Sequence, residues 1–470
     1  MKIKKICCIG AGYVGGPTMA VIALKCPEIQ VTVVDSNIEK INNWNSKDLS
    51  ELPVFEPGLS KVVAKTRNKN LFFSNNLADS INDAEMIFMA VNTPTKLKGE
   101  GKGYAADLTY VENCAKQIAK FSKSDKIVVE KSTLPVRTAE RIKNILKKNN
   151  DKVNFEVISN PEFLAEGTAI NDLFKSDRVL IGGDYTDTGR AAVNKLVEIY
   201  KRWIPNNKII RTNVWSSELS KLVSNAMLAQ RISSINSISA LCEKTQANIE
   251  EVSKAVGMDS RIGSNFLKSS IGFGGSCFKK DILNLVYIAR QYELEEVAVF
   301  WENVVKINNY QTFRLGEKII KLFKSKEKNT TISILGWSFK KDTNDSRESA
   351  SISLANQLLE KNFTVRIYDP MVSNSRIIED INNNLKNSKK TNIQMKKTIS
   401  KVLICDNPYN ALNNSNLAVV CTEWDEFKLL DWKRIFNNMN INPWIFDGRN
   451  ILDRNKLNKI GFKTFFIGQP

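Results

Sequence analysis

The amino-acid sequence predicts an α/β protein with two doubly wound domains that are joined by a long central helix and a helical middle region. Near both ends of the chain, short apolar runs alternate with helix-like stretches, which is the pattern of parallel sheets covered by helices. Between residue 215 and about residue 323, strand signals nearly disappear. We therefore expect three domains, at residues 1–214, 215–325 and 326–470.

The first domain opens with a glycine-rich turn between two strands. An apolar run at 6–9 precedes the sequence GAGYVG at 10–15, a helix-like stretch follows, and the next apolar run ends at Asp35. In such a turn the second glycine lets the backbone approach a pyrophosphate, while the first and third serve the turn and the packing. Asp35 lies where a carboxylate binds ribose hydroxyls and repels a 2′-phosphate. We predict a Rossmann-like domain that binds NAD rather than NADP, with a merely structural glycine turn as the alternative.

Three further apolar runs of this domain each lead into a polar loop: residues 86–91, 126–130 and 156–159. The carboxyl ends of parallel strands line the ligand crevice of a doubly wound sheet. Thr133, Glu162 and Glu166 follow such ends and are therefore candidate site residues. Polar residues at these positions often only cap helices or form turns, and that alternative stays open.

The segment after Trp215 predicts a long connecting helix, on which Lys221 and Asn225 lie one turn apart and share a face. A second strand–helix pattern then begins, with strands expected at 331–335, 365–369, 417–421 and 444–447 and a helix near 351–360. This second sheet lacks the glycine fingerprint, so we do not expect it to hold a dinucleotide in the same way. The Asn- and Lys-rich stretch 373–401 is the best candidate for a variable surface excursion.

The composition restricts the possible chemistry. The chain has no histidine, which removes the commonest general base, the Ser-His and Cys-His pairs and histidine-ligated metals. Eight cysteines are scattered without a C-x-x-C pair, so we expect neither a metal site nor a disulfide framework. This cysteine usage indicates a reducing compartment, and we predict a cytoplasmic protein.

The net charge of +18 is compatible with nucleic acid, an anionic surface or anionic small molecules as partners. The lysines are spread along the whole chain, and no nucleic-acid-binding module is recognisable, so a solvated basic surface is favoured. No apolar run approaches the roughly 18 residues of a membrane span. We expect a soluble protein that binds neither nucleic acid nor membrane.

Cys277 is the strongest candidate for a reactive group. It lies in the segment GFGGSCFKKD at 272–281, beside Lys279 and Lys280 and just before an expected helix. A helix N-terminus and neighbouring ammonium groups favour the thiolate, which is the nucleophilic form of cysteine. A free cysteine is more often a small buried residue without chemistry, and this motif alone leaves both possibilities open.

Together these motifs resemble the UDP-glucose/GDP-mannose dehydrogenase family. The resemblance covers essentially the whole chain and is carried by residues 6–16, 91–95, 130–133, 160–167, 231–239, 272–277 and 446–449. It implies a two-step, four-electron oxidation of UDP-glucose at C6 of the sugar to UDP-glucuronate. It further implies NAD as the cofactor, no metal, and a covalent route through a thiohemiacetal and a thioester.

The resemblance also implies roles for individual residues. Cys277 would capture the aldehyde, and Lys221 and Asp281 would stabilise the developing oxyanion and handle protons. The water that hydrolyses the thioester would be arranged by Thr133, Glu162 and Asn225. Substrate contacts would come from Phe163, Leu164, Lys221, Asn225, Arg261, Lys268, Phe273, Gly274, Phe339, Lys340 and Arg449. NAD contacts would come from Gly10, Gly12, Tyr13, Val14, Gly15, Asp35, Lys40, Thr93, Glu166, Lys280 and Arg347.

Two features bear on affinity and assembly. Lys40 stands where close relatives carry arginine, which keeps the charge but loses the planar fork, so only cofactor affinity is put in doubt. Arg261 would reach the substrate of a neighbouring subunit, so the resemblance implies a homo-oligomer, either a dimer or a dimer-based hexamer.

Two alternatives remain. The substrate could be GDP-mannose or a UDP-N-acetylhexosamine, although the agreement over residues 215–277 favours UDP-glucose. The chain could also bind a nucleotide sugar without catalysis, but the joint presence of Cys277, Lys221 and Asp281 argues against this.

Overall fold

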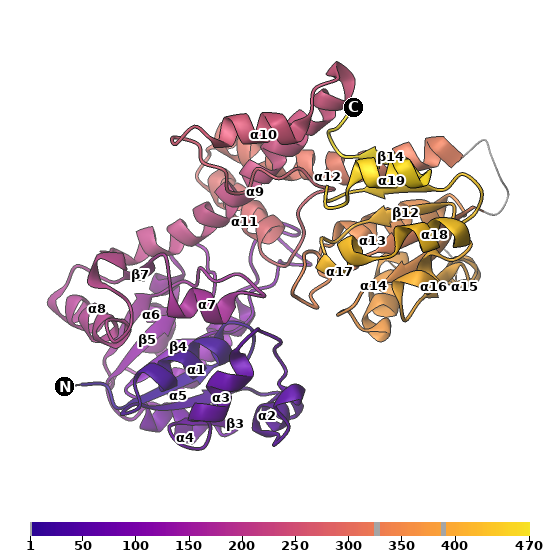
Figure 1. Ribbon diagram of the computed structural model, residues 1–470. Helices are drawn as coiled ribbons and strands as arrows, with labels where there is room; N and C mark the ends of the chain where they lie inside the picture. Colours follow the sequence, from indigo (N-terminus) through magenta and orange to yellow (C-terminus); the bar gives the residue numbers. More distant parts are fainter. Residues whose placement is uncertain (1, 324–329, 387–391) are drawn as a thin grey trace. The chain divides into compact units, whose positions relative to one another are not determined.

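The computed structural model describes residues 2–323, 330–386 and 392–470 (Figure 1). Contacts divide the chain into two compact units, Met1–Ser224 with Leu283–Leu294 and Asn225–Ile282 with Glu295–Pro470. Each unit contains one sheet with helices, which confirms the expected α/β class. The expected long helix is α9 (Val214–Thr245), and it belongs partly to each unit. The boundaries of the three expected domains stay a prediction.

The first unit contains an eight-stranded sheet in the order β3-β2-β1-β4-β5-β6-β7-β8. Neighbouring strands run parallel, except that β6 and β7 pair antiparallel. The chain reverses its direction of travel across the sheet at β1, so the loops after β1 and β4 are neighbours at the carboxyl edge. The strands are β1 (Lys5–Ile9), β2 (Gln30–Val34), β3 (Leu71–Ser74), β4 (Met86–Met89), β5 (Lys126–Glu130), β6 (Phe155–Ser159), β7 (Val179–Gly182) and β8 (Ile209–Thr212).

The register aligns the carboxyl ends of five of these strands. Ile9 pairs with both Val34 and Met89, Met89 pairs with Glu130, and Glu130 pairs with Ser159. The residues that follow these ends are therefore neighbours along one edge of the sheet. We call them the first-sheet row: Gly10, Asp35, Ala90, Lys131 and Asn160.

Helices cover both faces of this sheet, as a doubly wound fold requires. Side chains of β4 alternate between the two cores, with Met86 and Phe88 in one and Ile87 and Met89 in the other. The first core is covered by α1 (Gly15–Lys25), α2 (Ile38–Asn45), α3 (Leu59–Thr66), α7 (Ala169–Phe174) and α8 (Asp187–Tyr200). The second is covered by α4 (Leu77–Asp83), α5 (Thr109–Phe121) and α6 (Thr138–Asn149).

The second unit contains a six-stranded parallel sheet in the order β11-β10-β9-β12-β13-β14, which repeats the order of the first six strands of the first sheet. The strands are β9 (Thr331–Leu335), β10 (Thr364–Tyr368), β11 (Val402–Ile404), β12 (Leu417–Val420), β13 (Trp444–Asp447) and β14 (Lys463–Phe466). The helices are α10 (Ile249–Gly257), α12 (Glu295–Phe323), α13 (Ala350–Glu360), α14 (Asn374–Lys386), α15 (Asn392–Ile399), α16 (Pro408–Leu412), α17 (Asp425–Leu429), α18 (Trp432–Asn438) and α19 (Arg454–Ile460). Helix α11 (Phe278–Gln291) crosses from the second unit into the first.

The second sheet carries its own strand-end carboxylate, Asp369, but uses it differently from Asp35. Oδ2 of Asp369 accepts hydrogen bonds from the backbone of Trp337 at 2.6 Å and Ser338 at 3.0 Å and from the Trp424 indole at 3.1 Å. These bonds tie the carboxyl end of β10 to the loops that carry Trp337 and Trp424. The expectation that this sheet does not hold a dinucleotide as the first one would stays a prediction.

The expected surface excursion at 373–401 is wrong for its first half. Helix α14 buries Ile377, Ile381 and Leu385 in the core of the second unit. These apolar residues recur every four positions, so they lie on one face of a helix. Residues 387–391 of this stretch lie outside the described part of the chain.

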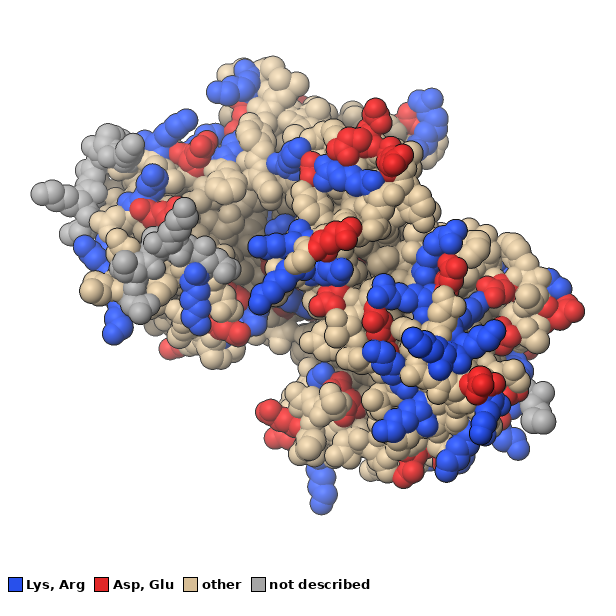
Figure 2. Space-filling view, turned by 180° about the vertical axis from the view of Figure 1, so that it is seen from behind, with Lys and Arg blue, Asp and Glu red and all other residues tan. Residues whose placement is uncertain are grey.

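Charged side chains are distributed broadly over the surface. Figure 2 shows lysine and arginine side chains across the visible face with acidic side chains among them. Nothing in the described ranges forms a helix both long enough and apolar enough to cross a membrane.

A buried pair of carboxyl groups lies in the first unit. Glu130 ends β5 with 1% of its surface exposed, and Glu218 of α9 is 2% exposed. The Glu218 carboxyl is close enough to raise the pKa of Glu130, and Glu218 also accepts the backbone N–H groups of Arg137 at 2.7 Å and Ala139 at 2.8 Å. Burial raises the pKa of Glu218 to about 7 and raises the pKa of Glu130 well above its usual value.

This pair predicts that the protein loses stability as the pH rises. Between the ordinary glutamate pKa of about 4.3 and the folded value near 7, the folded state keeps a proton on each of the two carboxyl groups, whereas the unfolded state loses both, so the free energy of unfolding falls by up to about 2.7 kcal/mol per pH unit. Glu130→Gln removes one of the two titrating carboxyl groups and leaves Glu218 buried, so it should roughly halve this slope. Urea unfolding of both proteins from pH 5 to pH 8 tests this, and equal slopes would contradict it.

Candidate functional site

The glycine-rich turn after β1 is shaped by close packing at two of its glycines. Gly10 has a φ of +111°, and a Cβ there would lie 2.3 Å from the Ala90 carbonyl oxygen. A Cβ on Gly15 would lie 2.0 Å from the carbonyl oxygen of Gly10. Gly12, by contrast, has no atom within 4 Å of the position its Cβ would take. The turn therefore keeps open space beside its second glycine.

Asp35 is held at the end of β2 as an oriented carboxylate. Its Oδ2 accepts the Ala11 N–H at 3.0 Å and pairs with Lys40 Nζ at 2.9 Å, and its Oδ1 accepts the Asn37 N–H at 3.0 Å. Partial burial would raise the pKa of Asp35, but these backbone bonds and the Lys40 ammonium lower it overall. Asp35 is therefore a fixed negative charge beside the glycine turn.

These residues fit a dinucleotide. The N-cap residue of α1, Val14, supplies no side-chain hydrogen bond to the first-turn amides, and a helix N-terminus attracts phosphate. The open space at Gly12 and the carboxylate of Asp35 suit a pyrophosphate and a ribose, respectively. The loops after β4 and β5 are joined nearby, where Thr93 Oγ1 donates to the Thr133 carbonyl at 3.1 Å.

Glu162 lies at the centre of a buried polar cluster. Its Oε2 pairs with Lys131 Nζ at 2.8 Å, its Oε1 accepts the Phe163 N–H at 2.9 Å, and its side chain is 15% exposed. Burial would raise the pKa of the Glu162 carboxyl, but the Lys131 ammonium outweighs burial and lowers it. Sequence analysis predicted Glu162 as a site residue but assigned no role to Lys131. The position of Lys131 directly after a buried strand could have indicated it.

Phe163 lies between two cations. The Arg178 guanidinium is 3.9 Å from the centre of its ring, and Lys221 Nζ is 5.3 Å from it. Cation–π attraction of this kind fixes the ring and both cations. Sequence reasoning brought Phe163 and Lys221 into one site and missed Arg178, which has no motif around it.

Cys277 is exposed, and it immediately precedes the first residue of α11. Its Sγ lies 3.5 Å from Ser276 Oγ. The other seven cysteines are buried or half-buried free thiols, and burial raises the pKa of Cys114, for example, to about 12. The alternative that Cys277 is only a buried packing residue is therefore wrong, because its side chain faces solvent.

The glycine-rich loop before Cys277 is held in place by other segments of the second unit, to which the loop itself belongs. The Asn308 side chain accepts the Phe273 N–H at 2.8 Å and donates to the Phe273 carbonyl at 3.0 Å. A Cβ on Gly274 would lie 2.6 Å from the Glu348 carbonyl oxygen and 2.9 Å from the Cβ of Phe339. The glycine is thus required for close approach, and Asn308 is a holding residue that the sequence did not indicate.

Asp281 is buried one helical turn after Cys277. Its Oδ2 accepts from Asn225 Nδ2 at 2.6 Å, and its Oδ1 pairs with Lys280 Nζ at 2.6 Å. Only 1% of the Asp281 side chain is exposed. The predicted residues Asn225, Lys280 and Asp281 are therefore in direct contact.

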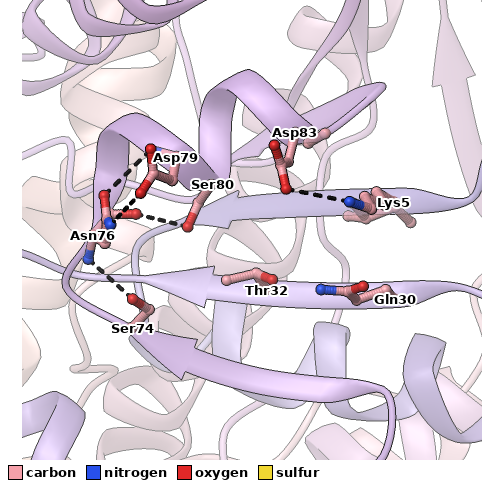
Figure 3. A pocket seen from close by; sticks show the side chains of 10 residues that line it. Lys5, Gln30, Thr32, Ser74, Asn76, Asp79, Ser80 and Asp83 are labelled. Atoms are coloured by element: carbon pink, nitrogen blue, oxygen red, sulfur yellow. Dashed lines mark hydrogen bonds and ion pairs between the residues drawn. The ribbon is translucent and has the colours of Figure 1, made fainter.

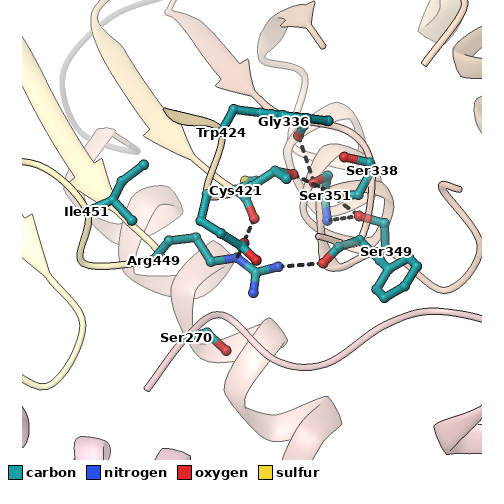
Figure 4. A network of polar contacts seen from close by, with 12 residues as sticks. Ser270, Gly336, Ser338, Ser349, Ser351, Cys421, Trp424, Arg449 and Ile451 are labelled. Atoms are coloured by element: carbon teal, nitrogen blue, oxygen red, sulfur yellow. Dashed lines mark hydrogen bonds and ion pairs between the residues drawn. The ribbon is translucent and has the colours of Figure 1, made fainter. Parts of the chain in front are cut away.

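Arg449 joins loops at the carboxyl edge of the second sheet (Figure 4). Its Nε donates to the Cys421 carbonyl at 2.7 Å and its Nη2 to the Phe339 carbonyl at 2.8 Å, and it pairs with Glu423. Only 13% of its side chain is exposed. Arg449 therefore connects the loops after β9 and β12, and one of its partners is the predicted substrate residue Phe339.

The remaining predicted residues occupy more open positions. Arg261 is 86% exposed and pairs with Asp259 at 2.6 Å, and Arg347 is bound to Asp345 at 2.6 Å. Lys268 is exposed, and Lys340 Nζ lies 5.6 Å from the ring of Phe339. Leu164 and Tyr13 are half-buried and pack against the first core, and Glu166 is half-buried as well. Their assigned roles stay predictions.

A separate pocket of about 210 Å³ lies between α4 and the strands β1 to β3 (Figure 3). Lys5 there pairs with Asp83 at 3.2 Å, and Asn76 binds Asp79 at 2.6 Å. Because Lys5 begins β1 and Gly10 follows its other end, this pocket is distinct from the glycine turn.

Comparisons with known proteins agree along the whole chain. The UDP-glucose/GDP-mannose dehydrogenase family matches through its NAD binding domain at residues 4–204, its central domain at 215–310 and its UDP binding domain at 333–454. The UDP-glucose 6-dehydrogenase of Drosophila melanogaster is 53% identical over 99% of this chain and 96% of its own length. That of Bos taurus is 54% identical over 100% and 94%. A UDP-glucose dehydrogenase structure from Pyrobaculum islandicum has a TM-score of 0.83 at 26% identity, covering 100% and 98%.

The contacts of Asp35 predict a strong preference for NAD over NADP. In Asp35→Asn the carboxylate no longer repels a 2′-phosphate and Lys40 loses its partner, so the ratio of kcat/KM for NAD to that for NADP should fall about tenfold or more. Glu39→Gln removes a charge from the first turn of α2 and should leave the ratio unchanged. An unchanged ratio in Asp35→Asn would contradict the assignment.

Proposed function

The chain belongs to the UDP-glucose/GDP-mannose dehydrogenase family, and from this premise we propose that it oxidises the C6 hydroxyl of UDP-glucose to a carboxylate with NAD. The observation that carries the proposal is the exposed Cys277, which immediately precedes α11. One turn later on the same helix, the buried Asp281 accepts a hydrogen bond from Asn225. A thiol in this setting allows an aldehyde to be captured without histidine.

UDP-glucose is the substrate that the relatives favour. Proteins that are 52–54% identical over almost the whole chain are named UDP-glucose 6-dehydrogenases. Structures named for UDP-N-acetyl-mannosamine or GDP-mannose dehydrogenases are only 20–24% identical to this chain, so they support the fold but not the substrate. GDP-mannose and UDP-N-acetylhexosamines therefore remain weaker alternatives.

We assign the oxidation steps to residues around the cysteine. The glycine turn and Asp35 would hold NAD, which would supply the hydride acceptor. Loss of the hydroxyl proton and of one hydride from C6 to a first NAD would give the aldehyde. The Cys277 thiolate would add to its C6 to form a thiohemiacetal, and loss of a second hydride to a second NAD would give the thioester. Lys221 would stabilise the oxyanion at C6 through its positive charge, and Asp281 would handle the proton. The buried contacts of Asp281 with Asn225 and Lys280 support a fixed position for this carboxylate.

We assign the hydrolysis of the thioester to Glu162, Thr133 and Asn225. Glu162 would accept a proton from the attacking water, and thiolate would leave C6 as the carboxylate forms. Two features support a base at this position. Neighbouring groups keep Glu162 ionised, and its side chain is still partly exposed.

We further propose that the protein acts in the cytoplasm as a homo-oligomer, with Arg261 completing the site of a neighbouring subunit. The proposal of a reducing compartment is supported by the eight free cysteines, all within the described residues. The exposure of Arg261, at 86% of its side chain, supports this role, although its Nε and Nη2 pair with the Asp259 carboxylate in the isolated chain.

The covalent route predicts different outcomes for two substitutions of the nucleophile. Cys277→Ser should form an ester to the sugar slowly and hydrolyse it poorly, because an alkoxide leaves less readily than a thiolate. Intact-protein mass spectrometry after incubation with UDP-glucose and NAD should therefore reveal an adduct in Cys277→Ser and none in Cys277→Ala. Cys421→Ser is the matched control, since its thiol is buried, and it should retain turnover. If Cys277→Ser turned over at nearly the parent rate, the covalent mechanism through Cys277 would be contradicted.

A further inference from the structure

Strand β5 has a buried lysine at each end, and the two lysines have different partners. Lys126 at the start donates to the carbonyl oxygens of Asn82 at 2.8 Å and Ala84 at 2.6 Å. Lys131 directly after the strand faces the Glu162 carboxylate instead. Both residues are 3% exposed. The two lysines therefore differ in their direct partners, because Lys131 forms an ion pair with a carboxylate, whereas Lys126 donates to backbone carbonyls and feels Asp83 and Glu85 only as nearby charges.

The ammonium of Lys131 is fully satisfied where it lies. It contacts Glu162 Oε2 at 2.8 Å, Asn160 Oδ1 at 3.1 Å and the Tyr200 hydroxyl at 3.3 Å. An ammonium has three donors, and three acceptors are present. Tyr200 in turn donates to Asn160 Oδ1 at 2.7 Å, which closes the cluster. Because Asn160 is a neighbour of Lys131 in the first-sheet row, the backbone itself fixes this arrangement.

The surroundings of Glu162 leave Lys131 as its principal counter-charge. Thr18 of α1 lies 3.4 Å from Oε2, and the Tyr200 hydroxyl of α8 faces the same cluster. Lys221 of α9 adds a weaker positive influence, and it lies over the ring of Phe163. Arg178 stacks on that ring as well. Without Lys131, the cluster would hold a carboxylate among neutral groups with only a more distant ammonium.

We propose that Lys131 is a positioning residue for thioester hydrolysis, because its buried ammonium holds Glu162 as an ionised, oriented carboxylate. The inference rests on the proposed role of Glu162. Burial would lower the pKa of Lys131, but Glu162 and Tyr200 outweigh burial and raise it, so Lys131 stays charged through the working pH range. Removing the charge should therefore raise the pKa of Glu162 and protonate it at a higher pH.

The decay of the Cys277 acyl-enzyme as a function of pH tests this inference. In single turnovers with UDP-glucose and NAD, quenched flow with intact-protein mass spectrometry follows the decay. The rate of decay should fall at low pH, where Glu162 becomes protonated, and we call this part of the pH–rate profile the acidic limb. In Lys131→Met and Lys131→Gln the acidic limb should move to higher pH by one unit or more, so that at a pH on this limb decay is about tenfold slower than in the parent. Lys131→Gln keeps hydrogen-bonding capacity and serves where Lys131→Met does not fold. Lys131→Arg should keep the limb near that of the parent.

Lys126→Met is the matched control, because it removes a buried lysine from the other end of the same strand. It should lower stability without moving the limb. An unmoved limb in folded Lys131→Met and Lys131→Gln, together with slow decay in Glu162→Gln, would overturn the inference and leave the proposed function intact. If Glu162→Gln instead decays at the parent rate, the role of Glu162 is wrong and the inference falls with it.

Discussion

The alignment of parallel strand ends is the constraint on which both units depend. In the first sheet the register brings Gly10, Asp35, Ala90, Lys131 and Asn160 into one row. Position 10 requires a glycine, because a Cβ there would collide with the Ala90 carbonyl oxygen. The polar members of the row, Asp35, Lys131 and Asn160, lie at the edge where doubly wound sheets bind ligands. The second sheet repeats the order, and its strand-end carboxylate Asp369, like Asp35, accepts hydrogen bonds from the protein's own donors.

Without histidine, the charges of the site depend on buried neighbours. Lys131 keeps Glu162 ionised, and Asn225 with Lys280 holds Asp281. A buried charge is costly unless it is paired and hydrogen-bonded, so each of these groups is tied to its partner by packing. In the proposed mechanism, the fixed position of Asp281 and the ionised state of Glu162 are therefore features of the folded structure and not of single residues.

Much of the fold could be predicted from the sequence, because long apolar runs and the glycine turn are local signals. The runs 126–130 and 331–335 coincide with β5 and β9. Short strands such as β11, whose residues are half-buried or exposed, give no such signal, and the antiparallel β7 departs from the repeating pattern. The motif residues of the site were likewise visible. Arg178 and Asn308 were not, because their roles arise from contacts between segments far apart in the sequence. Lys131 had a local signal, its position directly after β5, but its partner Glu162 could be identified only from the folded structure.

The yield of NADH per molecule of UDP-glucose tests the central claim most directly. With UDP-glucose limiting and NAD in excess, absorbance at the NADH band and chromatography of the sugar products measure both sides of the reaction. A covalent route through Cys277 that ends in hydrolysis predicts two NADH for each UDP-glucose, with UDP-glucuronate as the product and no free aldehyde. One NADH for each UDP-glucose, with release of the C6 aldehyde, would contradict the account.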